Sequence, residues 1–304
     1  MFEIIKPGTK IDFMKRKWIG FLFSGIVMLI GIISLVMHGG PIYGIDFAGG
    51  TLVQVKFAQP VAIDAIRGAL QDGGLAGGSV QGFEAEGKGE YLIRLQTSSA
   101  DLEGLSAAIK AALAKQFGEK AFEVRRVEMV GPKVGKDLRT KGILATIFAL
   151  IAMLIYISFR FDFRFAVGAV VAVFHDVIVT IGVLSVLNIE FSILILAAIL
   201  TIVGYSINDT IVVYDRIREN TPKMRREPFE KMLNVTVNET LSRTILTGMS
   251  TLMVLIVLFF MGGGVIHDFT LTLIVGIIFG TYSSVYIASV TVLVWENKFP
   301  KKKR

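Results

Sequence analysis

The 304 residues of the chain are 53% hydrophobic and only 19% charged, below the roughly 25% charged residues of soluble domains. The apolar residues gather in runs of about 20, the length that spans a bilayer core. The net charge of +7 comes partly from a basic tail after the last apolar run, which is typical of membrane topology and not of nucleic-acid binding. The absence of cysteine excludes disulfides, thiolate metal sites and a cysteine nucleophile.

Residues 1–17 are predicted to form a cytoplasmic N-terminus and residues 18–37 a first transmembrane helix. Lys15, Arg16 and Lys17 precede this run, as they would in a signal peptide. The run is long, however, and no small-x-small cleavage site follows it. We therefore interpret it as an uncleaved anchor.

Residues 38–141 are predicted to form an extracytoplasmic α+β domain. Alternating apolar residues predict strands around 53–57 and 91–95, and further strands are expected at 79–86 and 122–129. Helical spacing of apolar residues predicts one helix from Ile63 and another from Leu102. The resulting β-α-β-β-α-β order is that of a ferredoxin-like fold. Residues 131–135 then join the domain to the membrane, as a plain linker or as a hinge.

Five further apolar runs complete six predicted transmembrane helices; they cover residues 142–159, 165–187, 191–214, 243–262 and 269–295. Residues 215–242 are predicted to be a cytoplasmic loop and 296–304 a basic cytoplasmic tail. Lys and Arg are concentrated in alternate short loops, which places both termini in the cytoplasm.

Ionisable groups inside the apolar runs identify candidate functional residues, because each costs about 2.5–3.5 kcal/mol on insertion scales. His175 and Asp176 fall near the middle of the third run. Asp209 lies in the fourth run, more than a turn before Asp215, and Arg243 opens the fifth. Asp209 and Arg243 are therefore expected at similar depth.

A carboxyl beside an arginine is charged, whereas the same carboxyl alone in an apolar medium is protonated. If Arg243 moves relative to Asp209, the carboxyl can take up a proton from one side of the membrane and release it to the other. The predicted site is therefore proton-coupling, with Asp209 and Arg243 as its residues and the proton gradient in place of a cofactor.

Each of these groups also has a structural interpretation. Asp209 would be a polar clamp between helices, and Arg243 would only extend its side chain to the membrane surface. For His175, Asp176, Ser206, Asn208 and Asp215 a proton path and helix packing both stay open. Small residues at every fourth position, Gly276, Gly280 and Ser284, predict close helix packing.

Conventional enzyme chemistry has no support in the sequence. There is no P-loop, no metal-ligand spacing and no nucleophile elbow around Ser206. Neither a catalytic residue, a metal nor a cofactor is predicted. The Asn-x-Thr triplets at Asn208, Asn234 and Asn238 match a glycosylation pattern, but the topology makes these matches accidental.

Several motifs together resemble the SecF family, membrane subunits of the SecDF accessory complex of bacterial protein export. They are 12–15 (DFMK), 44–50 (GIDFAGG), 174–176 (FHD), 203–210 (VGYSINDT), 214–220 (YDRIREN) and 241–244 (LSRT). The likeness covers essentially the whole chain.

The resemblance implies a fold related to the RND transporters, with this chain as one half of a pseudo-symmetric bundle and SecD as the other. It further implies a proton-driven role in moving preprotein out of the SecYEG channel, with Asp209 and Arg243 in proton coupling. Expected partners are SecD, SecYEG through SecD, preprotein and membrane lipids. Gly44, Asp46, Gly49 and Gly50 belong to a family signature that we interpret as a structural turn.

Two other functions are compatible with the residues alone. One is a small-molecule exporter of the RND type, although the single modest external domain argues against it. The other is a scaffold of the translocase that transports nothing and uses its charges for assembly.

Overall fold

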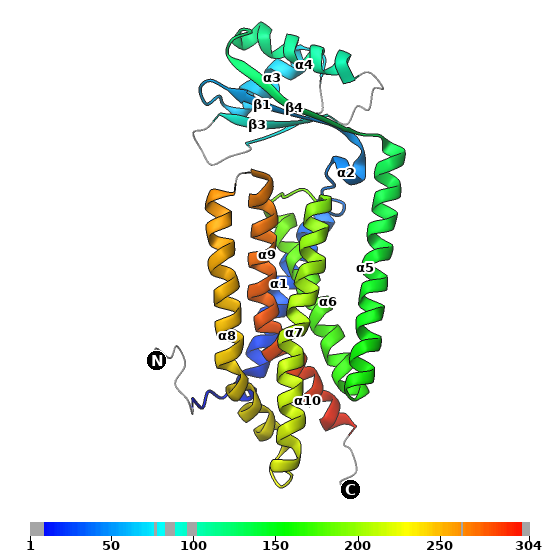
Figure 1. Cartoon of the computed structure of the whole chain (residues 1–304), viewed down its shortest axis with the longest axis vertical. Helices are drawn as coiled ribbons and strands as arrows, with labels where there is room; N and C mark the ends of the chain where they lie inside the picture. The colour runs from blue at the N-terminus through cyan, green and yellow to red at the C-terminus, as the bar shows by residue number, and fades with distance from the viewer. Residues whose placement is uncertain (1–8, 76–77, 83–88, 96–101, 263, 300–304) are drawn as a thin grey trace.

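The computed structural model of the chain describes residues 9–75, 78–82, 89–95, 102–262 and 264–299. A small α+β domain stands on one end of a bundle of long helices (Figure 1). The bundle begins with α1 and ends with α10. The first residues of α1 and the last residues of α10 lie at the end of the bundle away from the α+β domain. We call that side of the molecule the far end of the bundle.

Six helices in the described part of the chain are long and apolar enough to cross a membrane, as predicted. They are α1 (Lys17–Met37, preceded by the turn η1, Met14–Arg16), α5 (Pro132–Arg160), α6 (Phe163–Val186), α7 (Ile193–Lys223), α8 (Phe229–Met261) and a composite last helix of α9 (Gly264–Ser283), the π-helical turn η2 (Ser284–Ala288) and α10 (Ser289–Lys298).

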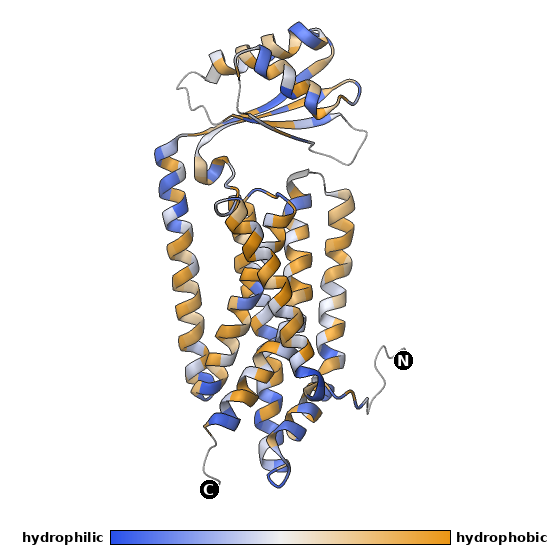
Figure 2. Ribbon diagram, turned by 180° about the vertical axis from the view of Figure 1, so that it is seen from behind, coloured by the Kyte–Doolittle hydropathy of each residue, from blue (hydrophilic) through white to orange (hydrophobic). Residues whose placement is uncertain are grey.

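Three of these helices form the interior of the bundle. In α6, α7 and the last helix, 56%, 50% and 61% of the most apolar window is buried, against 17%, 6% and 17% in α1, α5 and α8. Apolar residues cover the outside of the helices, and α5 stands apart from the rest (Figure 2). The exposed apolar faces of α1, α5 and α8 are therefore surfaces for lipid or for a partner helix.

The α+β domain has the predicted ferredoxin-like order. Its elements are β1 (Gly50–Phe57), α3 (Ile63–Asp72), β2 (Ser79–Gly82), β3 (Glu90–Leu95), α4 (Leu102–Phe117) and β4 (Phe122–Val130). The sheet order is β2-β3-β1-β4, and every neighbouring pair is antiparallel. The end of the strand predicted at 79–86 lies outside the described residues.

One face of this sheet packs against α3 and α4, and the other is turned toward the bundle (Figure 1). Val53, Val55 and Phe57 are buried in the core between sheet and helices, together with Ile93. Gln54 and Lys56 alternate with them and are half-buried. This period of two is why the strand pattern could be recognised.

The helix boundaries differ from the predictions in two places. The segment 131–135 is not a linker, because α5 already begins at Pro132, and proline is favoured in the first turn of a helix. The loop predicted at 215–242 is also mostly helical, since α7 continues to Lys223 and α8 begins at Phe229. These helices run beyond their apolar parts, and their polar ends contact each other.

Contact between glycines sets the distance between α1 and α6. A Cβ atom added at Gly31 would lie 2.7 Å from the Cα of Gly182, and one added at Gly182 would meet Gly31 at the same distance. The two backbones therefore touch directly. No larger residue fits at either position without moving a helix.

We expect Gly31→Val to destabilise the fold by about 1–3 kcal/mol, because the added side chain separates α1 from α6. Thermal unfolding of the purified protein in detergent measures the effect. Gly25→Val is the matched control, since it lies on the same helix with nothing within 4 Å of an added Cβ. Equal melting temperatures for the two variants would contradict this account of the helix contact.

Candidate functional site

Asp176 of α6 is the centre of a polar network inside the bundle. Its side chain is completely buried. Oδ1 lies 2.9 Å from Nδ1 of His175, and Oδ2 accepts hydrogen bonds from Ser206 of α7 at 2.5 Å and Ser283 of α9 at 2.8 Å. One carboxyl thus joins three helices.

The network continues through His175 to α1. Nε2 of His175 lies 3.0 Å from Oγ of Ser24, and Tyr282 donates to the carbonyl oxygen of Gly20 at 2.6 Å. Ser24 and Tyr282 are 3.4 Å apart. A neutral imidazole with its proton on Nδ1 satisfies both contacts, because it donates to Asp176 and accepts from Ser24. Every member of this network has a partner.

Asp209 is placed differently, although it lies only one turn beyond Ser206 on α7. It is 3% exposed, and its Oδ2 atom has no hydrogen-bond partner among the described residues. A buried polar atom without a partner costs about 1–3 kcal/mol, more when charged. The described residues therefore contain one carboxyl with a partner for both oxygens, Asp176 of α6, and one carboxyl with an unpaired oxygen, Asp209 of α7.

Two contacts at the far end set the register of α7 against α8. Arg216 donates to Glu239 at 2.7 Å, and Asn220 donates to Thr236 at 3.1 Å. Because the two helices are antiparallel, the same register places Asp209 opposite residues 246–247 of α8. The depth of Asp209 in the bundle follows from these polar contacts.

By this register Arg243 lies about one turn closer to the far end than Asp209. Its side chain is exposed on the outside of the bundle. Arg243 is the charged group that interacts electrostatically with Asp209, but within the described residues no ion pair joins them. The expectation of similar depth thus holds to within one helical turn.

The other candidates separate into different surroundings. Ser206 belongs to the Asp176 network, whereas Asn208 is exposed on the outside of α7. Asp215 lies near the far end and accepts from Arg160 at 3.2 Å. The five residues considered as a proton path therefore do not form one continuous chain. No group of metal-ligating side chains occurs in the described residues.

The glycine-rich signature forms the base of the α+β domain. Gly44 and Gly49 flank the short helix α2 (Ile45–Ala48), and Gly49 and Gly50 have φ of +78° and +129°. A Cβ atom at Gly49 would lie 2.9 Å from the Cα of Pro132, at the start of α5. The signature is thus a tight turn, as interpreted from the sequence.

Asp46 has a further role in this turn. Its Oδ2 atom accepts a hydrogen bond at 3.0 Å from the backbone N–H of Ile193, the first residue of α7. The first N–H groups of a helix have no partner within the helix. Asp46 therefore caps the helix that carries Asp209.

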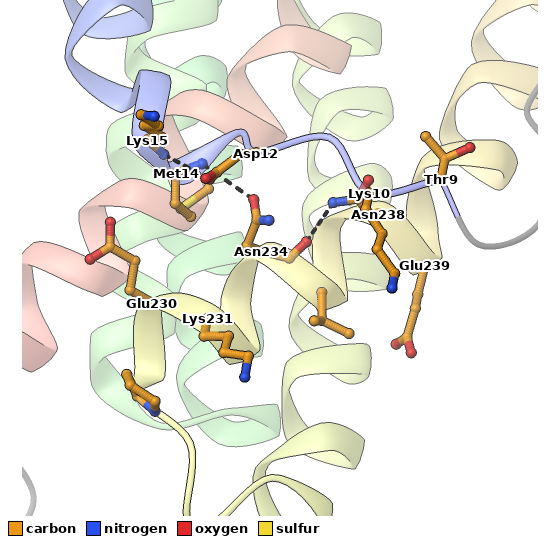
Figure 3. Close-up of a pocket in the computed structure, with 12 residues that line it drawn as sticks. Thr9, Lys10, Asp12, Met14, Lys15, Glu230, Lys231, Asn234, Asn238 and Glu239 are labelled. Atoms are coloured by element: carbon orange, nitrogen blue, oxygen red, sulfur yellow. Dashed lines mark hydrogen bonds between the residues drawn. The ribbon is translucent and has the colours of Figure 1, made fainter.

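Sequence reasoning missed the role of two asparagines on α8. Asn234 accepts from the backbone N–H of Phe13 at 2.9 Å, and Asn238 both accepts from and donates to the backbone of Ile11 at 2.8 Å. They line a cavity of about 770 Å³ at the far end (Figure 3). Both asparagines belong to Asn-x-Thr triplets, but the spacing of a triplet does not reveal this binding of the N-terminal segment.

A second missed contact joins the two parts of the molecule. Arg94 of β3 forms an ion pair of 2.6 Å with Glu190, in the loop between α6 and α7. Burial raises the pKa of Glu190 above its ordinary value, Arg94 opposes that shift, and Asp268 adds to it. The two residues are 96 positions apart, so no local pattern connects them.

Six apolar helices with buried and exposed charges, and a β-α-β-β-α-β domain at one end, define a multi-pass membrane protein with a charged site in its bundle. Family models match at two places. Residues 109–298 match "Protein export membrane protein SecD/SecF, C-terminal", and residues 37–61 match the "SecD/SecF GG Motif".

The chain is also similar to proteins described as protein translocase subunit SecF. One from Magnetococcus marinus is 46% identical over 297 residues, 97% of this chain and 94% of that protein. One from Escherichia coli O157:H7 is 38% identical over 96% of this chain and 90% of that protein. The chain belongs to the SecF family.

Solved structures of SecDF share the fold. The crystal structure from Thermus thermophilus matches with a TM-score of 0.84 and 36% identity, over 95% of this chain and 39% of that chain. A SecDF structure in a super-membrane-facing form matches with a TM-score of 0.70, over 98% of this chain and 40% of that chain. The chain thus spans about two fifths of the SecDF chains, so its bundle corresponds to one part of theirs.

We expect Asp176→Leu to destabilise the bundle more than Asp176→Asn. Leucine leaves His175, Ser206 and Ser283 without their acceptor, at about 1–3 kcal/mol for each group, whereas asparagine keeps one acceptor oxygen. Thermal unfolding in detergent gives the order.

Asp215→Leu is the control for that comparison, because it removes an ion pair that is 43% and 46% exposed and worth about 0–1 kcal/mol. A melting temperature for Asp176→Leu equal to that of the control would show that the network does not stabilise the bundle.

Proposed function

We propose that this chain is an accessory subunit of the bacterial Sec protein translocase, which uses the proton-motive force to help complete protein export across the cytoplasmic membrane. Its relatives of 38–46% identity are described as translocase subunits. The observation that supports proton coupling is the buried Asp209. Its Oδ2 atom has no partner within the described part of the chain, and the exposed Arg243 lies about one turn away.

In this proposal the far end of the bundle faces the cytoplasm. Arg160, Arg164 and Arg218 lie in or beside the connections at that end, and basic residues are retained on the cytoplasmic side of membrane proteins. The α+β domain is then extracytoplasmic, where it can act on a preprotein that leaves the channel. Both termini are cytoplasmic.

The site in this chain is one half of a complete site, and the other half comes from SecD. A guanidinium group such as that of Arg243 is unstable against lipid, so its exposed position favours an acidic partner on a neighbouring helix. The SecDF chains that match are more than twice as long as this one. Contact with the SecYEG channel would follow through SecD.

Asp209 would alternate between a charged state near Arg243 and a protonated state when the helices move apart. A membrane potential of 100 mV supplies about 2.3 kcal/mol for each charge that crosses. In this cycle the Asp176 network acts as a fixed anchor, because its hydrogen bonds join α6, α7 and α9. No cofactor is needed.

We expect Asp209→Asn to abolish the proton-gradient-dependent part of export, because the amide cannot take up and release a proton at that site. The assay follows translocation of a preprotein into inverted membrane vesicles, with and without an imposed gradient, in a strain whose own gene is replaced. Asp215→Asn is the control, since it makes the same change on the same helix at a half-exposed position.

Gradient-dependent export that persists in Asp209→Asn would contradict the proposal. Copurification of SecD with the variant separates the proton-coupled function from the scaffold function. A scaffold role predicts that Asp209→Asn loses SecD together with export, whereas the proposal predicts that SecD stays bound. No observation favours the small-molecule exporter.

A further inference from the structure

The α+β domain is attached to the bundle covalently on one side only. The chain enters the sheet from α2 into β1 and leaves it from β4 into α5. β1 and β4 are neighbours, and β4 is an edge strand. The other half of the sheet, β3 and β2, extends over the bundle away from α5 (Figure 1).

Arg94 and Glu190 support this second half. Arg94 alternates with Ile93 and Leu95, which point into the core of the domain, so its side chain points toward the bundle. Among the described residues, Arg94–Glu190 is the only ion pair between strands β1–β4 and the helical bundle. It is therefore a second point of attachment, opposite the covalent one.

A second hydrogen bond holds the arginine of the ion pair in place. Nη1 of Arg94 also donates to Oε1 of Gln81 on β2 at 3.0 Å, and the side chains of Arg94 and Glu190 are 18% and 14% exposed. A partly buried ion pair adds little to stability. With its geometry fixed, this pair instead specifies how the α+β domain is placed on the bundle.

Glu190 lies in the loop just before α7, the helix that carries Asp209. Ser192 caps α7 by accepting from Ile195, and Asp46 accepts from Ile193. The α7 helix then runs about 24 Å to Asp209 without a break. A displacement of this loop would be transmitted along α7, because a helix moves as a rigid element.

Solved relatives differ in arrangement. The two SecDF structures have the same 36% identity to this chain, but the TM-score falls from 0.84 to 0.70 in the super-membrane-facing form while the coverage rises from 95% to 98%. The fold of this chain thus occurs in more than one arrangement among solved SecDF structures.

We propose that Arg94 and Glu190 are positioning residues that couple the α+β domain to α7, and through α7 to Asp209. The inference rests on the proposed function, because it names the contact through which proton uptake at Asp209 and movement of the domain influence each other. The coupling works in both directions, as any linkage between two sites must.

Charge reversal tests the coupling in the vesicle assay described above. We expect Arg94→Glu and Glu190→Arg each to lower gradient-dependent export by roughly 2-fold to 30-fold, with gradient-independent export unchanged. The double variant, which restores an ion pair with reversed charges, recovers most of the loss. Arg67→Glu is the matched control, since Arg67 pairs with Asp64 within the same domain.

The absence of cysteine permits a second test. Arg94→Cys and Glu190→Cys are combined and linked with a bifunctional thiol reagent about as long as the two side chains that it replaces. We expect the linked protein to lose gradient-dependent export. Reduction of a cleavable linker restores the level of the unlinked double variant.

Single reversals that export like the wild type, a double reversal without recovery, or normal gradient-dependent export in the linked protein would each overturn the coupling. These outcomes are distinct from failure of the proposed function. If the function is right and the coupling wrong, Asp209→Asn still abolishes gradient-dependent export. If the function is wrong, Asp209→Asn exports normally whatever the charge variants do.

Discussion

The structure depends on one constraint: a polar group placed among apolar helices must find its partners within the bundle, because lipid offers none. Asp176 meets this constraint with partners from α6, α7 and α9, and His175 extends the contacts to α1. Since the partners come from four helices, satisfying one carboxyl also fixes those helices relative to each other. Asp209 lies one turn beyond Ser206 on α7, so a network to which it does not belong holds it in a defined place.

Such a network forms only where helix axes approach closely. Glycine and serine on the last helix make this approach, as their spacing predicts: a Cβ atom at Gly276 would lie 2.2 Å from the side chain of Ile202, and one at Gly280 would lie 3.1 Å from Ser206. Gly280 therefore admits the same serine that donates to Asp176. The small residues and the polar network are two parts of one helix contact.

Periodicity made most of the fold predictable. The alternation around Val53 and the helical spacing around Ile63 depend on neighbours in sequence, and they yielded the ferredoxin-like order. Hydropathy located six helices but not their ends, because contacts such as Asn220 with Thr236 stabilise polar helix ends that are not apolar. The separation of Asp176 from Asp209, and the pairing of Arg94 with Glu190, depend on side chains that meet across the fold, which no local pattern records.

The exposed polar side chains of α8 differ in whether their own helix offers them an acceptor. On α8 the exposed hydroxyl groups of Thr247 and Ser250 donate to carbonyl oxygens of their own helix, so they tolerate an apolar surrounding. For the guanidinium of Arg243 on the same helix no such acceptor is found among the described residues, and a charged group in contact with lipid is costly. In the proposed function an acidic surface of SecD would supply that acceptor. The same surface would cover Asn208, which is also exposed, so the proposal treats the buried Asp209 and the exposed Arg243 as parts of one site divided between subunits.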